Sequence, residues 1–290
     1  MIKDCYKRGR GPSRRTRSIC REEIMTFELY HTAHSTCSQK VRLTLAEKGY
    51  AERGKDWVDH EVDLGKFEQL KPEYLALNPN GVVPTFLHDG EVILESSAIV
   101  EYLDDIIPEP ALSPPDALGK ARMRAWLRYL EEVPTVAVRV PSFANLFAPM
   151  RFAKLQDEQF STHADRLPLR KEFYQRMTKD GFGEKDVGNA LEQIRQTCER
   201  MQQAIEETGG PWLLGEQFTL VDILVTPAID RMDDLGYADL WADLPRVVEW
   251  FERLRARPSY KSAFYPTARV SERYPDHFRT AADLKAERGY

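Results

Sequence analysis

Residues 27–49, FELYHTAHSTCSQKVRLTLAEKG, decide the fold of this chain, because they read as a strand, a polar loop and a helix in succession. Apolar and polar residues alternate at the start of the stretch, which predicts a half-buried strand. From Gln39 onward, apolar residues recur at helical spacing. Between the two lies Ser-Thr-Cys-Ser at positions 35–38. Backbone N–H groups at a helix start favour an anion and lower the pKa of a thiol held there. The loop therefore predicts a thiolate site, filled by Cys37 or by the thiol of a ligand.

The composition is that of an ordinary globular protein. The chain has 290 residues, enough for two domains, with 42% hydrophobic and 30% charged residues. No apolar run approaches the roughly 20 residues that a membrane-spanning helix needs. The net charge of -5 gives no reason to expect nucleic-acid binding. We therefore expect neither a membrane nor a nucleic acid as partner.

The cysteines are scattered and form no C-x-x-C pair; they are Cys5, Cys20, Cys37 and Cys198. This spacing disfavours a disulfide framework or a zinc site and suits a reducing cytoplasm. Cys198 lies on an apolar helical stripe and is expected to be a buried small hydrophobe. His31 and His34 flank the polar loop, but no third metal ligand lies nearby in the sequence. We predict a cytoplasmic protein with no metal site, and interpret both histidines as structural.

Residues 1–24 stand apart from the rest of the chain. They are rich in Arg and Ser and poor in large apolar residues, so we expect them to be disordered. They lack the apolar core of a secretory signal. A transit peptide is one alternative, but we favour a start of translation at Met25, directly before the first strand.

Residues 25–107 are predicted to form one domain. Residues 57–63 alternate like a second strand, which should run parallel to the first because a helix connects them. Residues 82–87 and 91–94 flank the turn His-Asp-Gly and predict an antiparallel hairpin. The order strand, helix, strand, hairpin and helix is that of a thioredoxin-like domain.

Two features of this domain point to ligand binding. Pro84 cannot donate to a strand ladder, so the backbone of Val83 is left to pair with something else. Ser96 or Ser97 is predicted to be the N-cap of the last helix of the domain, which gives a second helix start suited to an anion.

Residues 118–265 are predicted to form a second, all-helical domain. Four prolines mark a linker at 108–117, and the polar tail 266–290 carries no recognisable signal. Residues 151–185 are polar with weak periodicity and look like an insertion or lid. Thr219 and Asp222 have the spacing of a capping box.

Four segments, at this order and spacing, resemble the cytosolic glutathione S-transferases. They are STCSQKVRL (35–43), NPNGVVP (78–84), ESSAIVEYL (95–103) and FTLVDI (218–223). The resemblance covers residues 26–265. It implies a thioredoxin-like domain joined to an all-helical one, glutathione as co-substrate, a small hydrophobic electrophile as second substrate, and a homodimer.

Two branches of that family share features with the chain. The Ser-x-Cys loop resembles the zeta class (maleylacetoacetate isomerases) and the reductive hydroquinone dehalogenases. The segments KFEQ (66–69) and HDGEVILES (88–96), with the 151–185 insertion, resemble the bacterial β-etherases of lignin degradation. β-Aryl ether cleavage is therefore the first reaction to consider, and dehalogenation or isomerisation through Cys37 is the alternative.

The resemblance assigns the thiol chemistry to the polar loop. Ser35 would donate a hydrogen bond to the glutathione sulfur and favour the thiolate. Cys37 takes part in the chemistry in the zeta-like and dehalogenase-like branches, whereas a serine matching Ser38 is implicated in the etherase-like branch. We rank Ser35 first, Cys37 second and Ser38 third as catalytic residues. From the residues alone, Ser35 is equally well a plain N-cap.

The resemblance also implies a set of glutathione-binding residues. Val83, before a cis Pro84, would pair with the cysteinyl unit by strand addition. Glu95 would bind the γ-glutamyl ammonium and Ser96 the adjacent carboxylate. Gln69 matches a side chain that reaches the ligand. Two rival functions use the same fold: a non-catalytic glutathione-binding protein, and a thiol oxidoreductase in which Cys37 forms a mixed disulfide.

Overall fold

The computed structural model describes residues 26–147, 150 and 182–288. The expectations for residues 1–24 fall outside this part of the chain, and those for the 151–185 insertion do so almost entirely.

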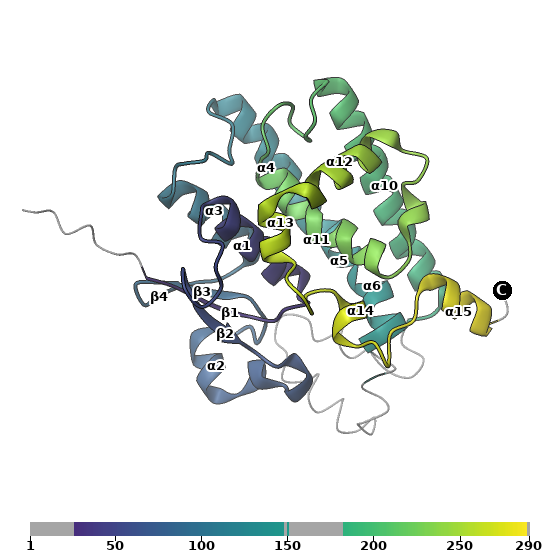
Figure 1. Cartoon of the computed structure of the whole chain (residues 1–290), viewed down its shortest axis with the longest axis horizontal. Coiled ribbons are helices and arrows are strands. Elements are labelled where there is room, and N and C mark those ends of the chain that lie inside the picture. Colours follow the sequence, from purple (N-terminus) through teal and green to yellow (C-terminus); the bar gives the residue numbers. More distant parts are fainter. Residues whose placement is uncertain (1–25, 148–149, 151–181, 289–290) are drawn as a thin grey trace, which may run out of the picture.

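The first domain is a four-stranded sheet with helices on both faces (Figure 1). The strand order is β2-β1-β3-β4; β1 runs parallel to β2, and β3 is antiparallel to β1 and β4. The parallel pair and the hairpin are therefore confirmed. Its main elements are β1 (Phe27–His31), α1 (Thr36–Glu47), β2 (Val58–Glu61), β3 (Thr85–His88), β4 (Glu91–Ile93) and α3 (Ser96–Ile106).

Helices α1 and α3 cover the face of the sheet that turns toward the second domain (Figure 1). The short helix α2 (Pro72–Leu77) lies on the other face, where Tyr74 packs on Val62 and Val83. Two 3-10 turns, Leu64–Lys66 and Glu68–Leu70, lead into α2.

One predicted helix start is confirmed and another is not. Helix α1 begins at Thr36, within the predicted polar loop, and the Ser35 side chain caps it. The predicted N-cap at Ser96 or Ser97 is wrong: α3 begins at Ser96, and its N-cap position is Glu95, whose side chain makes no capping hydrogen bond. Glu95, at the N-cap position, has a φ of 67°, in the left-handed region. A side-chain N-cap usually has an extended backbone, so this position does not have the geometry of a serine cap.

The second domain is helical throughout its described part, as predicted. Prolines at 134 and 141 break the helix after α4 into short pieces that bring the chain to the domain boundary. Its elements are α4 (Ala117–Glu132), α5 (Pro134–Ala137), α6 (Arg139–Ser142), the π-helical turn Phe143–Phe147, α10 (Glu184–Thr208), α11 (Leu220–Asp234), the 3-10 turn Ala238–Leu240, α12 (Pro245–Ala256), α13 (Pro258–Ala263), α14 (Val270–Arg273) and α15 (Ala281–Arg288).

Helix α11 runs through the middle of this domain and is buried along nearly its whole length (Figure 1). The predicted capping box is confirmed: Thr219 Oγ1 accepts from the Val221 amide at 3.3 Å, and Asp222 Oδ2 accepts from the Thr219 amide at 3.0 Å. Asp222 Oδ1 also accepts from Trp250 Nε1 at 2.9 Å. On α10, Cys198 is fully buried, and burial raises its thiol pKa to about 12, which confirms its interpretation as a core residue.

The two domains share one apolar core. Buried residues from β1, α1 and α3 belong to the same cluster as those of α4, α10, α11 and α12. Helix α1 packs on α11 and α13 as closely as on α3. Arg257 donates two hydrogen bonds to Glu47 across this contact, at 2.8 and 2.7 Å. Helix α1 therefore lies directly at the domain boundary, and Arg257 holds its C-terminal end there.

Within residues 26–147, 150 and 182–288, no helix is long and apolar enough to cross a bilayer. The same ranges contain no cluster of His, Cys, Asp and Glu that could hold a metal ion.

Candidate active site

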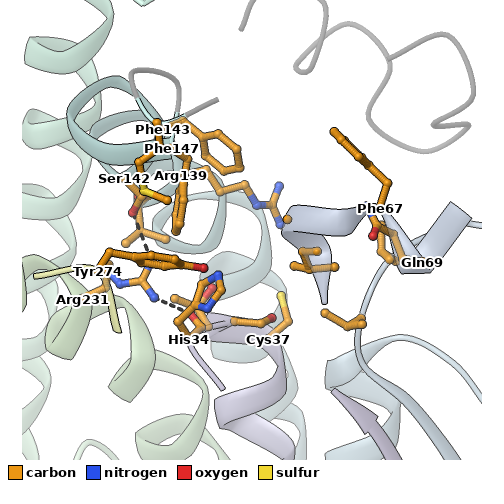
Figure 2. A pocket seen from close by; sticks show the side chains of 18 of the residues that line it. His34, Cys37, Phe67, Gln69, Arg139, Ser142, Phe143, Phe147, Arg231 and Tyr274 are labelled. Atoms are coloured by element: carbon orange, nitrogen blue, oxygen red, sulfur yellow. Dashed lines mark hydrogen bonds between the residues drawn. The ribbon is translucent and has the colours of Figure 1, made fainter. Parts of the chain in front are cut away.

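A pocket of about 400 Å³ lies where the polar loop meets the helical domain (Figure 2). One side is built by the first domain, from the loop 34–37, from Leu64, Gly65, Phe67 and Gln69, and from residues 81–83. The opposite side comes from the second domain: Val138, Arg139, Ser142, Phe143, Phe147, Met150, Arg231 and Tyr274. A molecule in this pocket would contact both domains at once.

Two of the three candidate catalytic residues line the pocket. Ser35 and Cys37 are half-buried at the start of α1, and the Cys37 side chain points into the pocket in Figure 2. Ser35 Oγ accepts a hydrogen bond from the Ser38 amide at 3.3 Å. The Ser38 side chain is fully buried, and Ser38 is not among the residues that line the pocket.

Two of the predicted glutathione-binding residues also line it, opposite Tyr274 and Arg231. Gln69 is buried, and its Oε1 atom has no hydrogen-bond partner within the described residues. Val83 precedes Pro84 through a cis peptide bond, as the resemblance implied. A buried amide oxygen without a partner is costly, so a ligand donor that reached Gln69 would be bound favourably.

The other predicted residues stand outside the pocket lining. Glu95 is exposed, Ser96 is buried at the start of α3, and Pro84 contributes no lining atom. The strained backbone of Glu95, with φ 67° and ψ 116°, is held by its surroundings rather than by its own preference.

The helical side of the pocket carries charged and aromatic residues that sequence reasoning missed. Arg231 is buried on α11; it donates to the His34 carbonyl oxygen and, at 3.4 Å, to Ser142 Oγ. Burial lowers the pKa of this guanidinium, although an arginine stays charged near neutral pH. Tyr274 comes from the tail to which no role was assigned. Arg231 could have been picked out from the sequence, because it is a basic residue in a helix predicted to be buried. The local sequence gives no such signal for Tyr274.

The loop is braced from behind by a buried network. Arg42 donates to His31 Nδ1 at 3.0 Å, and His31 Nε2 lies 2.6 Å from Asp59 Oδ1. Because an arginine only donates, Nδ1 accepts and Nε2–H donates to Asp59. Burial lowers the pKa of His31, which keeps the ring neutral. This histidine has the structural role that the sequence suggested.

His34 lies in the pocket itself, where its ring contacts Phe147 at 5.3 Å and Tyr274 at 5.4 Å between ring centroids. It joins the thiol loop to the aromatic wall of the second domain.

Comparison with known proteins gives this architecture its family. The family model of the glutathione S-transferase N-terminal domain matches residues 29–111, and that of the C-terminal domain matches residues 163–253. Together the two matches cover more than half of the chain. The chain belongs to the glutathione S-transferase family. The resemblance of the four sequence segments is thereby confirmed, as is the predicted fold class.

Several curated members of the family align with most of this glutathione S-transferase. Protein LigF of Sphingobium sp. strain SYK-6 is 28% identical over 84% of this chain and 95% of its own. The 2,5-dichlorohydroquinone reductive dechlorinase of Sphingobium indicum is 28% identical, covering 87% of each chain. The maleylacetoacetate isomerase of Pseudomonas aeruginosa is 29% identical over 82% of this chain and 95% of its own.

Solved structures agree with this family assignment. The crystal structure of the beta-etherase LigF superposes with a TM-score of 0.72 at 28% identity, covering 82% of this chain and 98% of that one. A glutathione transferase homologue from sulfitobacter with bound glutathione superposes with a TM-score of 0.60 at 25% identity, covering 82% and 96%. The protein is an enzyme that uses glutathione as co-substrate against an electrophile.

Proposed function

We propose that this transferase cleaves β-aryl ethers by attack of a glutathione thiolate held at Ser35. One observation carries the proposal: a single pocket joins the Ser35 loop, Gln69 and Val83 on one side to the aromatic and cationic wall on the other. The first side suits the tripeptide, and the second suits an aromatic electrophile.

Ser35 can cap α1 and serve the thiolate at the same time. A hydroxyl has two acceptor lone pairs and one donor proton. Its oxygen accepts from the Ser38 amide, so its proton is available for the sulfur. The start of α1 adds the favourable end of a helix dipole. A thiol has a pKa near 8.5, so a decrease of about two units would make the thiolate the main form at pH 7.

The remaining contacts to glutathione follow the family pattern. We infer that the Val83 backbone pairs with the cysteinyl unit, that Gln69 donates to or accepts from the tripeptide, and that Glu95 and Ser96 bind its γ-glutamyl end. Gln69 and Val83 line the pocket. Glu95 and Ser96 lie beyond its edge at the start of α3, so glutathione must extend out of the pocket to reach them.

The proposed reaction is a substitution at carbon. The thiolate sulfur forms a bond to the carbon that carries the aryloxy group, and the carbon–oxygen bond breaks. The oxygen leaves with the electron pair as a phenolate, which takes up the proton that the thiol released. Phe143, Phe147 and Tyr274 give the electrophile an aromatic wall, and the similarity to beta-etherase LigF over most of the chain supports this substrate class.

Cys37 supports a second candidate reaction, because it lies in the same pocket. In a reductive dehalogenation, a carbon–halogen bond would be replaced by carbon–hydrogen, and the thiols of glutathione and Cys37 would be oxidised to a mixed disulfide with release of the hydrogen halide. In a cis–trans isomerisation, a thiolate would add to a double bond and leave again after rotation. The similarity to a dechlorinase and an isomerase favours these as the alternative.

Kinetics of Ser35→Ala and Cys37→Ala against aryl ethers, chlorinated hydroquinones and maleyl compounds separates the two candidates. Ether cleavage that is lost in Ser35→Ala and retained in Cys37→Ala supports the first. Dehalogenation or isomerisation that is lost in Cys37→Ala supports the second. Ether turnover that is insensitive to Ser35 would refute the proposed thiolate site.

We also infer a cytoplasmic homodimer. The habit of the family supports the dimer, and the scattered cysteines of the sequence support a reducing compartment. Light scattering on the purified protein tests the dimer; a monomer at micromolar concentration would contradict it.

A further inference from the structure

The segment that follows α13 returns to the pocket and is fixed there by α11. Ala268 and Val270 are fully buried. Asp234 accepts hydrogen bonds from the Val270 amide at 2.7 Å and from the Ser271 amide at 3.3 Å. On the side of the first domain, Gln39 Nε2 of α1 donates a hydrogen bond to the Ala268 carbonyl oxygen at 3.0 Å.

Arg269 adds ion pairs to these hydrogen bonds. It forms ion pairs with Asp233 and, at 3.4 Å, with Asp230, both on the same face of α11. We call the contacts of Arg269, Val270 and Ser271 with these acids and Asp234 the tail clasp. Helix α14 has only four residues, so the clasp acts together with the apolar packing of Val270 on Leu146 and Leu235 to fix the segment.

The clasp ends at Tyr274, which stands in the pocket. Its ring meets His34 edge-on, at 5.4 Å and 75°, and lies at 89° to Phe147, 6.1 Å away. Figure 2 shows Tyr274 on the wall opposite Gln69, with its hydroxyl pointing away from Arg231 into the pocket, next to His34. The hydroxyl therefore projects from the second-domain wall toward the thiol loop, the region in which an attacked electrophile has to lie.

This end of the pocket favours negative charge. Among the described residues, the pocket lining includes two guanidinium groups, those of Arg139 and Arg231, and no carboxylate side chain. Arg231 is buried, so little solvent screens its charge, while Asp234 and Asp230 on the same helix offset part of that charge. A phenol next to such a cation is a good donor to an anionic oxygen.

We propose that Tyr274, positioned by the tail clasp, donates a hydrogen bond to an oxygen of the electrophile that carries or develops negative charge. The substrate class is then an electrophile with a phenolic leaving oxygen, or with an oxygen that becomes anionic next to the attacked carbon. This inference rests on the proposed attack of a thiolate in the same pocket.

The first test compares Tyr274→Phe with the wild type on aryl ethers whose leaving phenols differ in acidity. We expect kcat/KM to fall about 10-fold to 100-fold, the range for a hydrogen bond to a charged group, while glutathione affinity by calorimetry stays unchanged. A loss that grows as the phenol becomes less acidic identifies the leaving oxygen, and a uniform loss identifies the oxygen beside the attacked carbon.

The matched control is Tyr102→Phe, whose hydroxyl bonds to His88 at 2.6 Å, away from the pocket. It should leave both parameters unchanged. A Tyr274→Phe enzyme with wild-type kcat/KM, or one that loses only glutathione affinity, would overturn the proposal.

A second test does not need turnover. 4-Nitrophenolate is added to the glutathione-loaded protein, and its binding is followed by absorbance. We expect about 10-fold weaker binding to Tyr274→Phe, and equal binding would overturn the inference. If the wild type binds the phenolate but cleaves no ether, the proposed reaction fails while the assignment of Tyr274 stands.

The clasp is tested by Arg269→Gln, alone and combined with Tyr274→Phe. If the clasp acts through Tyr274, each single variant lowers kcat/KM, and the double variant is no worse than Tyr274→Phe. Additive losses would contradict this route. Arg257→Gln, which breaks the ion pair with Glu47 between α1 and α13, controls for lost stability and should leave electrophile kinetics unchanged.

Discussion

At the scale of single residues, Ser35 shows how a structural and a chemical role coincide. Its oxygen accepts the amide of Ser38, which is what an N-cap does, and its proton remains for a ligand. The choice between a capping serine and a catalytic serine, which the sequence posed, is therefore not exclusive.

We predict that Ser35→Ala lowers kcat/KM by about 100-fold near pH 7 and by much less at pH 9, because the thiol of bound glutathione would return toward its ordinary pKa. The measurement is the pH profile of kcat/KM for the best electrophile. Ser38→Ala is the comparison: the Ser38 hydroxyl is fully buried and has no hydrogen-bond partner among the described residues. A larger loss in Ser38→Ala than in Ser35→Ala would move the thiolate to Ser38.

The side chain of Asp230 makes the stability of the folded protein depend on pH. Burial raises its pKa to about 6, above the value near 4 expected in the unfolded chain. The folded protein then binds the proton more tightly, so this group contributes stability that is fully present below pH 4 and is lost as pH rises to about 6. The contribution is at most roughly 3 kcal/mol, at 1.36 kcal/mol per pKa unit.

In the wild type, ionisation of Asp230 should lower the free energy of unfolding as pH rises from 4 to 6. We therefore predict that Asp230→Asn, which cannot ionise, lacks this decrease. The measurement is the difference between the urea unfolding curves of wild type and variant across that range, because carboxylates with lowered pKa, such as Asp59, act in the opposite direction in both proteins. A difference that does not vary with pH would show that Asp230 titrates normally.

At the scale of elements, α11 connects stability to the site. Its start is held by the capping box, and its last turn both carries Arg231 to the pocket and holds the tail clasp. A shift of this one helix would move both the cation and the phenol of the electrophile wall.

We predict that Asp222→Ala costs about 3 kcal/mol or more of unfolding free energy, because it leaves the buried Thr219 and Leu213 amides and the Trp250 indole without an acceptor. Urea denaturation measures the loss. Asp116→Ala is the matched control, since it removes a cap from the exposed start of α4 and should cost only about 1 kcal/mol. Equal losses in the two variants would show that burial of the Asp222 capping box adds nothing to the free energy of unfolding.

Most elements could be predicted because their signals are local. The alternation in β1, the proline breaks after α4 and the stripe of α10 each follow from neighbouring residues. The cap of α3 could not be, because the left-handed backbone of Glu95 is imposed by the turn from β4 rather than by a preference of glutamate. Tyr274 could not be either, since the contacts that hold its segment lie more than 30 residues away on α11 and more than 200 away on α1.

At the scale of the whole molecule, the two domains are not independent bodies. The core is continuous across their boundary, and α1 contributes to both halves. The thiol loop and the electrophile wall are therefore held at a fixed separation by apolar packing, which is the condition for bringing two substrates together.

We predict a single unfolding transition for the full chain, with equal calorimetric and van't Hoff enthalpies. A fragment of residues 1–107 should fail to fold, because it exposes the face of α1 and α3 that the second domain covers. Scanning calorimetry and circular dichroism test the two statements. Two resolved transitions, or a folded fragment, would show that the shared core is not what couples the domains.

The pocket takes His34 to Cys37 from near one end of the chain and Tyr274 from near the other. Synthesis on the ribosome runs in that order, so a growing polypeptide exposes its thiol-activating loop long before the phenol that completes the electrophile wall has been made. A chain that ended at residue 265 would keep the thiol loop, Gln69 and Val83 but lack Tyr274 and the clasp that positions it, so attack on an acceptor should be slow. Reading frames shortened at this point should therefore give proteins that are retained on glutathione resin but turn over aryl ethers slowly.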